Sequence, residues 1–216
     1  MQKIWFTSDL HFGHKNILRH CNKRIDAFGL NSVIDKAEMI KKHDEFLITL
    51  WNNNVGRNDI VYILGDFSFR NSEETKKLLS RLNGKKFLIL GNHDKSSEKL
   101  NEYFVQITQM KEIIFKKNNF DFLKEDFGVF CCHYPMVTWS RKHYGVVNLH
   151  GHCHGKTDDY NNNSLDLRVD VGIDSELAKY GLVSLEQLYA FFKKKTDGEL
   201  FSDYVSRIRQ ENKIVI

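Results

Sequence analysis

The chain has 216 residues, of which 41% are hydrophobic and 28% charged, as in a soluble globular protein. This length predicts a single domain, residues 1–216, with a core large enough to need neither a disulfide nor a structural metal. The net charge of +4 does not favour a nucleic-acid partner, and no apolar stretch is long enough to span a bilayer.

The first half of the chain alternates apolar runs with amphipathic segments. The expected strands are residues 5–11, 60–66 and 85–90, and the expected helices are 12–20, 33–51 and 72–82. Asparagine and glycine between residues 52 and 56 suit a left-handed cap that ends the long helix. The order β-α-β-α-β predicts right-handed crossovers and a parallel sheet.

The second half has shorter runs separated by turn residues. Strands are expected at 111–117, 120–122, 128–132, 146–154 and 167–172, the first three of them connected by hairpins. Ser184 and Gln187 match a capping box that begins a helix, and residues 201–212 form a last helix that is a candidate appendage. The elements together predict two sheets, one βαβ-type and one hairpin-rich, with helices outside.

The cysteines indicate a reducing compartment. They are Cys21, Cys131, Cys132 and Cys153, and their spacing matches neither a zinc ribbon nor a disulfide framework. Cys131 and Cys132, adjacent on a strand, are expected on opposite faces. The first strand begins within a few residues of the N-terminus, so no signal peptide is expected. We therefore expect reduced thiols in a cytoplasmic protein.

Five apolar runs end in side chains that can bind metals or transfer protons. In chain order these side chains are Asp9, His11, Asp66, Asn92, His93, Asp94, His133, His152 and His154. Each group alone could be an ordinary polar turn, but chance is a poor explanation for five in succession. Because open α/β sheets place their ligands at the carboxyl ends of strands, we expect these side chains at one edge.

Spacing suggests how the side chains converge. Asp9 and His11 are two residues apart, as are His152 and His154, so on extended chain each pair points to one side. Cys153 then points away from the ligands. The glycines before Asp66 and Asn92 allow tight turns that bring each side chain in close.

The donor set predicts two metal ions. Seven ligands, namely Asp9, His11, Asp66, Asn92, His133, His152 and His154, are too many for one tetrahedral zinc and fit two ions that share a bridging carboxylate. Oxygen and imidazole donors without thiolate suit manganese, iron or zinc, and the affinity order does not choose among them. We expect manganese, with iron, zinc, nickel and cobalt as alternatives. Two divalent ions leave the pocket at about +2, which suits a phosphate.

Such a pair of ions, roughly 3.5–4 Å apart, can clamp both oxygens of an in-line displacement and convert a bridging water to hydroxide near neutral pH. The leaving alkoxide then needs a proton. We expect His93 to donate it, with Asp94 orienting or tuning the ring.

The five blocks resemble those of the calcineurin-like metallophosphoesterase superfamily, and they occur in that family's order. They are Asp9-x-His11, Gly65-Asp66, Gly91-Asn92-His93-Asp94, His133 and Gly151-His152-x-His154. The resemblance implies an α/β (α+β) fold, a four-layer α-β-β-α sandwich of two mixed sheets flanked by helices.

The resemblance also assigns ligands. It implies one ion on Asp9, His11, Asp66 and His154, another on Asp66, Asn92, His133 and His152, and a catalytic His93. Further motifs, among them Asp9-Leu10-His11-Phe12-Gly13-His14 and His133-Tyr134-Pro135, resemble a branch of small bacterial and phage phosphoesterases.

The expected function is that of a dinuclear phosphodiesterase acting on a small nucleotide-like or other soluble phosphate ester. A phosphomonoesterase, a nuclease and a non-catalytic scaffold of the same fold are the alternatives. The sequence Gly65-Asp66-Phe67-Ser68-Phe69-Arg70 departs from the protein-phosphatase pattern and argues against that branch. The candidate substrate contacts are His14, Arg19, Arg70, Arg141 and His150. The sequence leaves substrate identity and oligomeric state open.

Overall fold

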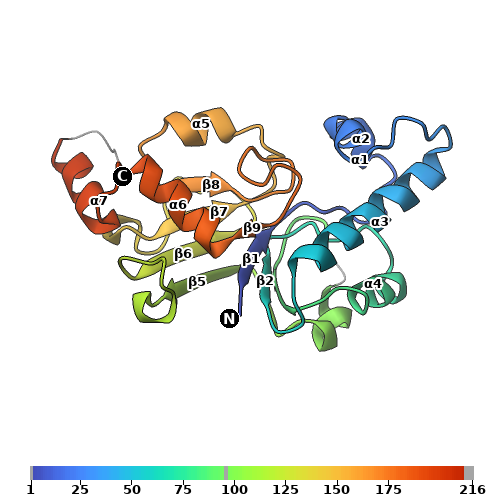
Figure 1. Ribbon diagram of the computed structural model, residues 1–216, viewed down its shortest axis with the longest axis horizontal. Coiled ribbons are helices and arrows are strands. Elements are labelled where there is room, and N and C mark those ends of the chain that lie inside the picture. The colour runs from blue at the N-terminus through green and yellow to red at the C-terminus, as the bar shows by residue number, and fades with distance from the viewer. Residues whose placement is uncertain (1, 95–96, 212–216) are drawn as a thin grey trace.

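The computed structural model contains two β-sheets flanked by helices and describes residues 2–94 and 97–211 (Figure 1). The first sheet has the order β4-β3-β2-β1-β9. Its strands are β1 (Ile4–Thr7), β2 (Ile60–Ile63), β3 (Lys85–Ile89), β4 (Gln106–Thr108) and β9 (Val183–Ser184). The first four are parallel and β9 is antiparallel to β1, which confirms the predicted parallel core. Strands β4 and β9 were not predicted, because β4 has only three residues and β9 only two.

The second sheet has the order β5-β6-β7-β8. Its strands are β5 (Met110–Phe115), β6 (Phe127–Cys132), β7 (Val147–His150) and β8 (Arg168–Asp170). Only β5 and β6 form an antiparallel hairpin, and β6, β7 and β8 are parallel. The strand predicted at 120–122 is wrong, because Phe120 and Phe122 lie in the loop between β5 and β6 and pack against the core from there.

Helices cover the outer sides of the sheets. They are α1 (Ile17–His20), α2 (Lys23–Ala27), α3 (Lys36–Asn54), α4 (Ser72–Leu79), α5 (Asp158–Asn163), α6 (Leu185–Lys195) and α7 (Phe201–Gln210), with 3₁₀ turns η1 (Ser97–Tyr103), η2 (Lys117–Asn119) and η3 (Lys142–Tyr144). The capping box of Ser184 and Gln187 is present. The left-handed cap of α3 is not. Val55 is extended there (φ −95°), because Asp59 accepts the N–H of Gly56 and holds the following turn.

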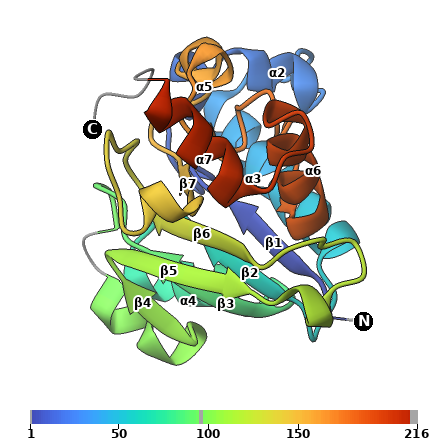
Figure 2. The ribbon, with the colours of Figure 1, turned by 90° about the vertical axis from the view of Figure 1, so that its left-hand side faces the viewer.

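Alternation along the strands divides the interior. Phe6 and Tyr62 of the first sheet meet Val129 and Leu149 of the second in one shared core. The opposite face of the first sheet, including Trp5, packs on the helices of the first half. Figure 2 shows β5 and β6 lying over β1–β3. Cys131 and Cys132 belong to different clusters, which confirms that they lie on opposite faces.

Helix α7 ends at Gln210, and Asn212, the predicted last residue of that helix, lies outside the described residues. In the part of the chain that is described, no helix combines the length and apolarity needed to cross a membrane.

Candidate metal centre

The loops that follow five parallel strands meet where the two sheets join. Main-chain bonds connect them: the Asp9 N–H donates to Gly65 O (3.1 Å), and the Gly151 N–H donates to His133 O (3.0 Å). The sequence placed the ligand residues at strand ends, and the structure brings those ends together.

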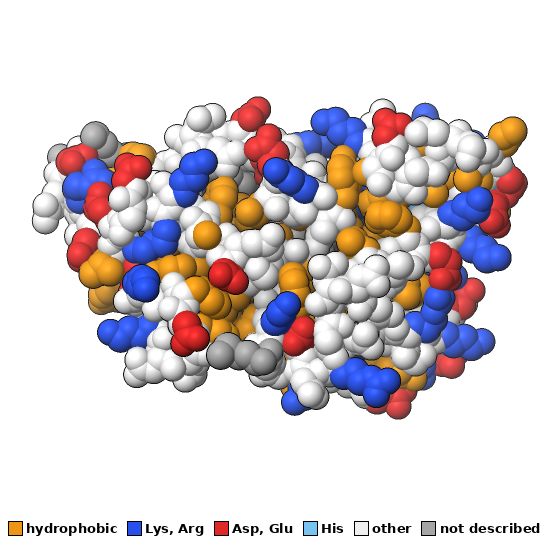
Figure 3. All heavy atoms as spheres, in the orientation of Figure 1, with side chains coloured by type: hydrophobic (Ala, Val, Ile, Leu, Met, Phe, Trp, Pro, Cys, Tyr) orange, Lys and Arg blue, Asp and Glu red, His pale blue; other side chains and the backbone are white. Residues whose placement is uncertain are grey.

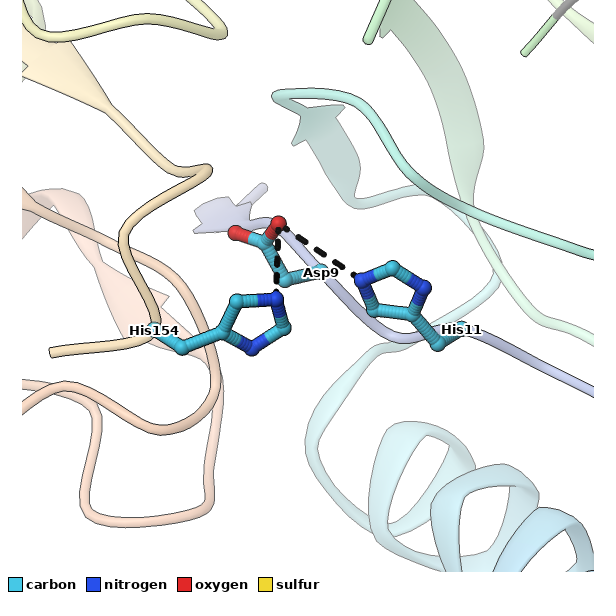
Figure 4. Close-up of side chains that lie close together, drawn as sticks. All are labelled: Asp9, His11 and His154. Atoms are coloured by element: carbon cyan, nitrogen blue, oxygen red, sulfur yellow. Dashed lines mark ion pairs between the residues drawn. The ribbon is translucent and has the colours of Figure 1, made fainter. Parts of the chain in front are cut away.

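The first half of the centre consists of Asp9, His11 and His154 (Figure 4). The Nε2 atoms of both histidines lie 3.8 Å from the same oxygen, Oδ1 of Asp9. Their rings are stacked with centroids 5.0 Å apart. Three donors from two distant segments therefore face one small space.

The second half consists of Asp66, Asn92 and His133. Oδ2 of Asp66 lies 3.7 Å from Nε2 of His133 and also 3.7 Å from Nε2 of His11 in the first half. Oδ1 of Asn92 lies 3.0 Å from Nε2 of His133. Asp66 therefore stands between the two halves. Asp9 is also close to Asp66 and His133, although the resemblance assigned it to one ion only.

His152 lies at the rim of the second half. Its side chain is exposed, and its ring contacts that of His133 edge-on at 5.1 Å. Its backbone N–H donates to Oδ2 of Asp9 (2.9 Å). Among the described residues, none of the three close groups of ligand atoms includes His152, so its ring would reach an ion only from the open side.

The ligands occupy strained backbone. Nine described non-glycine residues have positive φ, and five of them are predicted ligands: Asp9, His11, Asp66, His152 and His154. The expectation that extended chain aligns each pair is therefore wrong, because left-handed residues do so. A left-handed non-glycine residue costs about 1–3 kcal/mol and persists where the surroundings impose it, typically at functional sites.

The donors fit a cation. Oδ1 of Asp9 and both ring nitrogens of His11 are buried without a hydrogen-bond partner. Burial lowers the pKa of His11 to about 2, so its ring is neutral and can ligate. Burial raises the pKa of Asp9 to about 6, although His154 opposes the shift. Buried polar atoms without partners are rare, and a divalent ion would satisfy these.

A buried ionic network behind the first half was not predicted. Nδ1 of His154 donates to Oδ2 of Asp174 (2.7 Å), which also accepts from Nη2 of Arg24 (2.6 Å). Burial alone would lower the pKa of His154, but its bond to Asp174 raises that pKa to about 10. Burial would raise the pKa of Asp174, but Arg24 and His154 hold it well below its usual range.

Arg24 extends this network. Its guanidinium is fully buried and also donates to the carbonyl of Asp9 (2.7 Å). Nη1 of Arg24 lies 3.2 Å from Nε2 of His43, whose Nδ1 lies 2.9 Å from Asp44. Asp174 follows an apolar run like the other ligand residues, so that signal could have identified it. No sequence signal indicated Arg24, which lies in α2.

His93 lies on the open side of the second half. Its side chain is 42% exposed, with Nε2 3.9 Å from Oδ2 of Asp66. The sequence predicts that Asp94 orients or tunes that ring, but no hydrogen bond joins the two side chains. The Asp94 carboxylate instead accepts backbone N–H bonds from Asp66 (2.8 Å), Phe67 (3.1 Å) and Gly91 (2.8 Å). The His93 ring packs against Phe69, with centroids 4.4 Å apart.

Two of the candidate substrate contacts lie near the centre. His14 stacks on Phe69 at 3.9 Å and lies 5.3 Å from the ring of His11. Arg70 lines a cavity of about 220 Å³ together with His93, and its Nη2 donates to Asp44 (2.7 Å).

The other three candidates are placed differently. Arg19 is exposed and makes no side-chain hydrogen bond or ion pair with the described residues. Arg141 is paired with Glu112 of β5 (3.1 Å). The prediction that His150 contacts substrate is wrong, because its side chain is fully buried. Its Nδ1 hydrogen-bonds to the carbonyl of Gly151 and its Nε2 to the side-chain amide of Asn161.

Two mixed sheets that carry carboxylate and imidazole donors at their strand ends define a class, the metal-dependent phosphoesterases. A family model for calcineurin-like phosphoesterases matches residues 2–181. The chain therefore belongs to the calcineurin-like phosphoesterase family, whose members are metal-dependent hydrolases of phosphate esters.

Individual relatives agree with this assignment. An uncharacterized protein of Methanocaldococcus jannaschii is 29% identical over 196 residues, covering 90% of this chain and 93% of that protein. The gene 66 protein of Mycobacterium phage D29 is 29% identical over 182 residues, covering 72% and 80%. A crystal structure of a protein of unknown function from Aquifex aeolicus has a TM-score of 0.62 at 24% identity, covering 88% of this chain and 100% of that one, and supports the fold. The phage and archaeal relatives agree with the small branch that the motifs resemble.

Proposed function

We propose that this phosphoesterase is a dinuclear, manganese-preferring phosphodiesterase that acts on small nucleotide-like esters. The observation that carries the proposal is the position of Oδ2 of Asp66, 3.7 Å from Nε2 of both His11 and His133. One carboxylate between two imidazoles from opposite halves fits a ligand that two ions share.

The chain's own residues supply the rest. Asp9, His11, Asp66 and His154 would hold one ion, and Asp66, Asn92, His133 and His152 the other. Two such ions supply a water of lowered pKa and neutralise the phosphate oxygens. His93, on the open side, donates a proton from Nε2 to the leaving oxygen, while Phe69 supports its ring.

Space on both sides of the centre favours a diester over a monoester. A cavity of about 220 Å³ borders His93, and another of about 370 Å³ borders His154. A diester has two ester substituents, and each needs room beside the phosphorus. A monoester would use only one of these cavities.

The surface supports a small substrate rather than a nucleic-acid strand. On the face shown in Figure 3, lysines and arginines are dispersed among acidic side chains rather than gathered into one patch. The net charge of +4 agrees with this distribution. A groove that follows a nucleic-acid backbone needs a continuous positive surface.

The test is cleavage of bis(p-nitrophenyl) phosphate by metal-depleted protein supplied with one divalent ion at a time. We expect activity with manganese to exceed that with zinc, cobalt, nickel or iron. His93→Ala should lower kcat by about 10²–10⁴-fold, as expected for loss of a general acid, without loss of bound metal. His143→Ala, a change of an exposed histidine outside the centre, is the matched control. Inactivity with every ion would reject the proposal, and faster cleavage of p-nitrophenyl phosphate would favour a monoesterase.

A further inference from the structure

A cavity of about 660 Å³ lies beside the metal centre and has no role in the chemistry above. It is formed by the loop after β1, the beginning of α3 and the loop before α4. Its cationic lining residues are Lys15, Lys36, Lys41 and Arg70, with Glu74 as the acid among the described lining residues. We call it the lysine cavity.

The lysine cavity shares one wall with the metal centre. Phe69 lines the cavity, and its ring lies 5.2 Å from that of His11 and 4.4 Å from that of His93. Phe69 and Arg70 also line the smaller cavity that contains His93. A substrate held at the metals therefore needs to extend only across one aromatic ring to enter the lysine cavity.

The described lining of the lysine cavity holds more positive than negative charge. Lys15, Lys36 and Lys41 are exposed and make no ion pair with the described residues. Lys36 is the first residue of α3, where the helix dipole disfavours a cation, so helix stability does not explain it. Arg70 differs from the lysines because the buried carboxylate of Asp44 neutralises its charge. With Arg70 neutralised, three lysines stand against one acid among the described lining residues, and they attract an anion.

We propose that the lysine cavity binds a second phosphate group of the substrate. This inference rests on the proposed function and narrows its substrate class to nucleotide-like diesters that carry an additional phosphate. Lysine ammonium groups are mobile point charges that suit a terminal phosphate. The stacked rings of His14 and Phe69 offer an aromatic surface between the two phosphate positions, on which a base can lie.

The experiment compares two substrates with the same scissile bond. One is thymidine 5′-(p-nitrophenyl phosphate), and the other carries an added 3′-phosphate. With the wild-type protein and manganese, we expect the KM of the phosphorylated substrate to be roughly tenfold lower, as charge-assisted hydrogen bonds to phosphate would give. The advantage should shrink as salt is raised.

The variant Lys36→Gln/Lys41→Gln tests the location. Both side chains are exposed, so the variant should fold, and the ratio of the two KM values should fall toward one. Lys117→Gln, in the η2 turn between β5 and β6, should keep the wild-type ratio. Equal KM values in the wild type, or a ratio unchanged in the double variant, would overturn the inference while leaving the phosphodiesterase proposal intact. Failure to cleave either substrate, or bis(p-nitrophenyl) phosphate, would reject that proposal instead.

Discussion

Each half of the metal centre directs a histidine Nε2 atom at the site, but different contacts orient the two rings. In the first half, His154 points Nε2 at the site because its Nδ1 is held by the Asp174 carboxylate, which Arg24 neutralises. In the second half, His133 points Nε2 at the site because its Nδ1 donates to the carbonyl of Leu64 (2.7 Å). Outer partners of this kind fix the orientation of a ligating histidine.

The difference follows from what surrounds each half. Behind the first half, Arg24 of α2 and Asp174, which are far apart in the sequence, form an ion pair. The second half lies between loops packed backbone to backbone. A Cβ on Gly65, whose φ is +91°, would fall 2.5 Å from Nδ1 of His133, so only glycine fits there. One half therefore depends on buried charge and the other on main-chain geometry.

The largest effect is expected where the halves meet. Asp66→Asn keeps an oxygen that can accept the backbone N–H of His93. The substitution removes the negative charge and Oδ2, the carboxylate oxygen that lies between the two imidazoles. We expect activity to fall to background and the protein to retain less metal after dialysis, measured by elemental analysis. Near-normal activity in a folded Asp66→Asn protein would contradict the bridging position.

A smaller effect is expected in the first half alone. Asp174→Asn weakens the partner of His154 and should raise the manganese concentration for half-maximal activity by about 10–100-fold, as for other outer partners of metal ligands. Asp59→Asn is the matched control, because Asp59 also accepts three hydrogen bonds but lies at the opposite end of the sheet. If both variants shift the metal requirement equally, the ionic network has no specific role.

The second half should respond through stability. The Asp94 carboxylate accepts three backbone N–H groups, and Asp94→Asn leaves at least one of them without an acceptor. Each unsatisfied buried N–H lowers the free energy of unfolding by about 1–3 kcal/mol. Urea denaturation measures the loss. The manganese requirement should change less than in Asp174→Asn, and the reverse order would break the distinction between the halves.

The first half should also make the metal-free protein sensitive to acid. Burial lowers the pKa of His11 to about 2, against 6.5 in the unfolded chain. As pH falls below 6.5, the unfolded chain binds a proton that the folded ring does not, so His11 lowers the free energy of unfolding by about 1.4 kcal/mol per pH unit. The urea midpoints of the wild type and of His11→Asn are measured between about pH 6.5 and 4.5, and the change in their difference with pH reports this contribution. A constant difference would contradict it.

The sequence alone predicted the parallel core of β1, β2 and β3 and placed the candidate ligand residues at strand ends, because both depend on local patterns. Apolar runs specify buried strands, and polar residues directly after them fall at strand ends wherever those strands lie. The same reasoning failed for 120–122, where two half-buried phenylalanines pack on the core from a loop, and for His150, whose neighbours in the strand gave no sign that Asn161 covers it.

Only the tertiary structure decided how the candidate ligand side chains are oriented and which contacts support them. The left-handed backbone at Asp9 and His11, the placement of Arg24 behind them and the turn of Asp94 toward main-chain N–H groups all depend on segments far apart in the chain. Burial and charge pairing arise when those segments pack, so residue types and spacing predicted candidate ligands but not the contacts that hold these side chains in position.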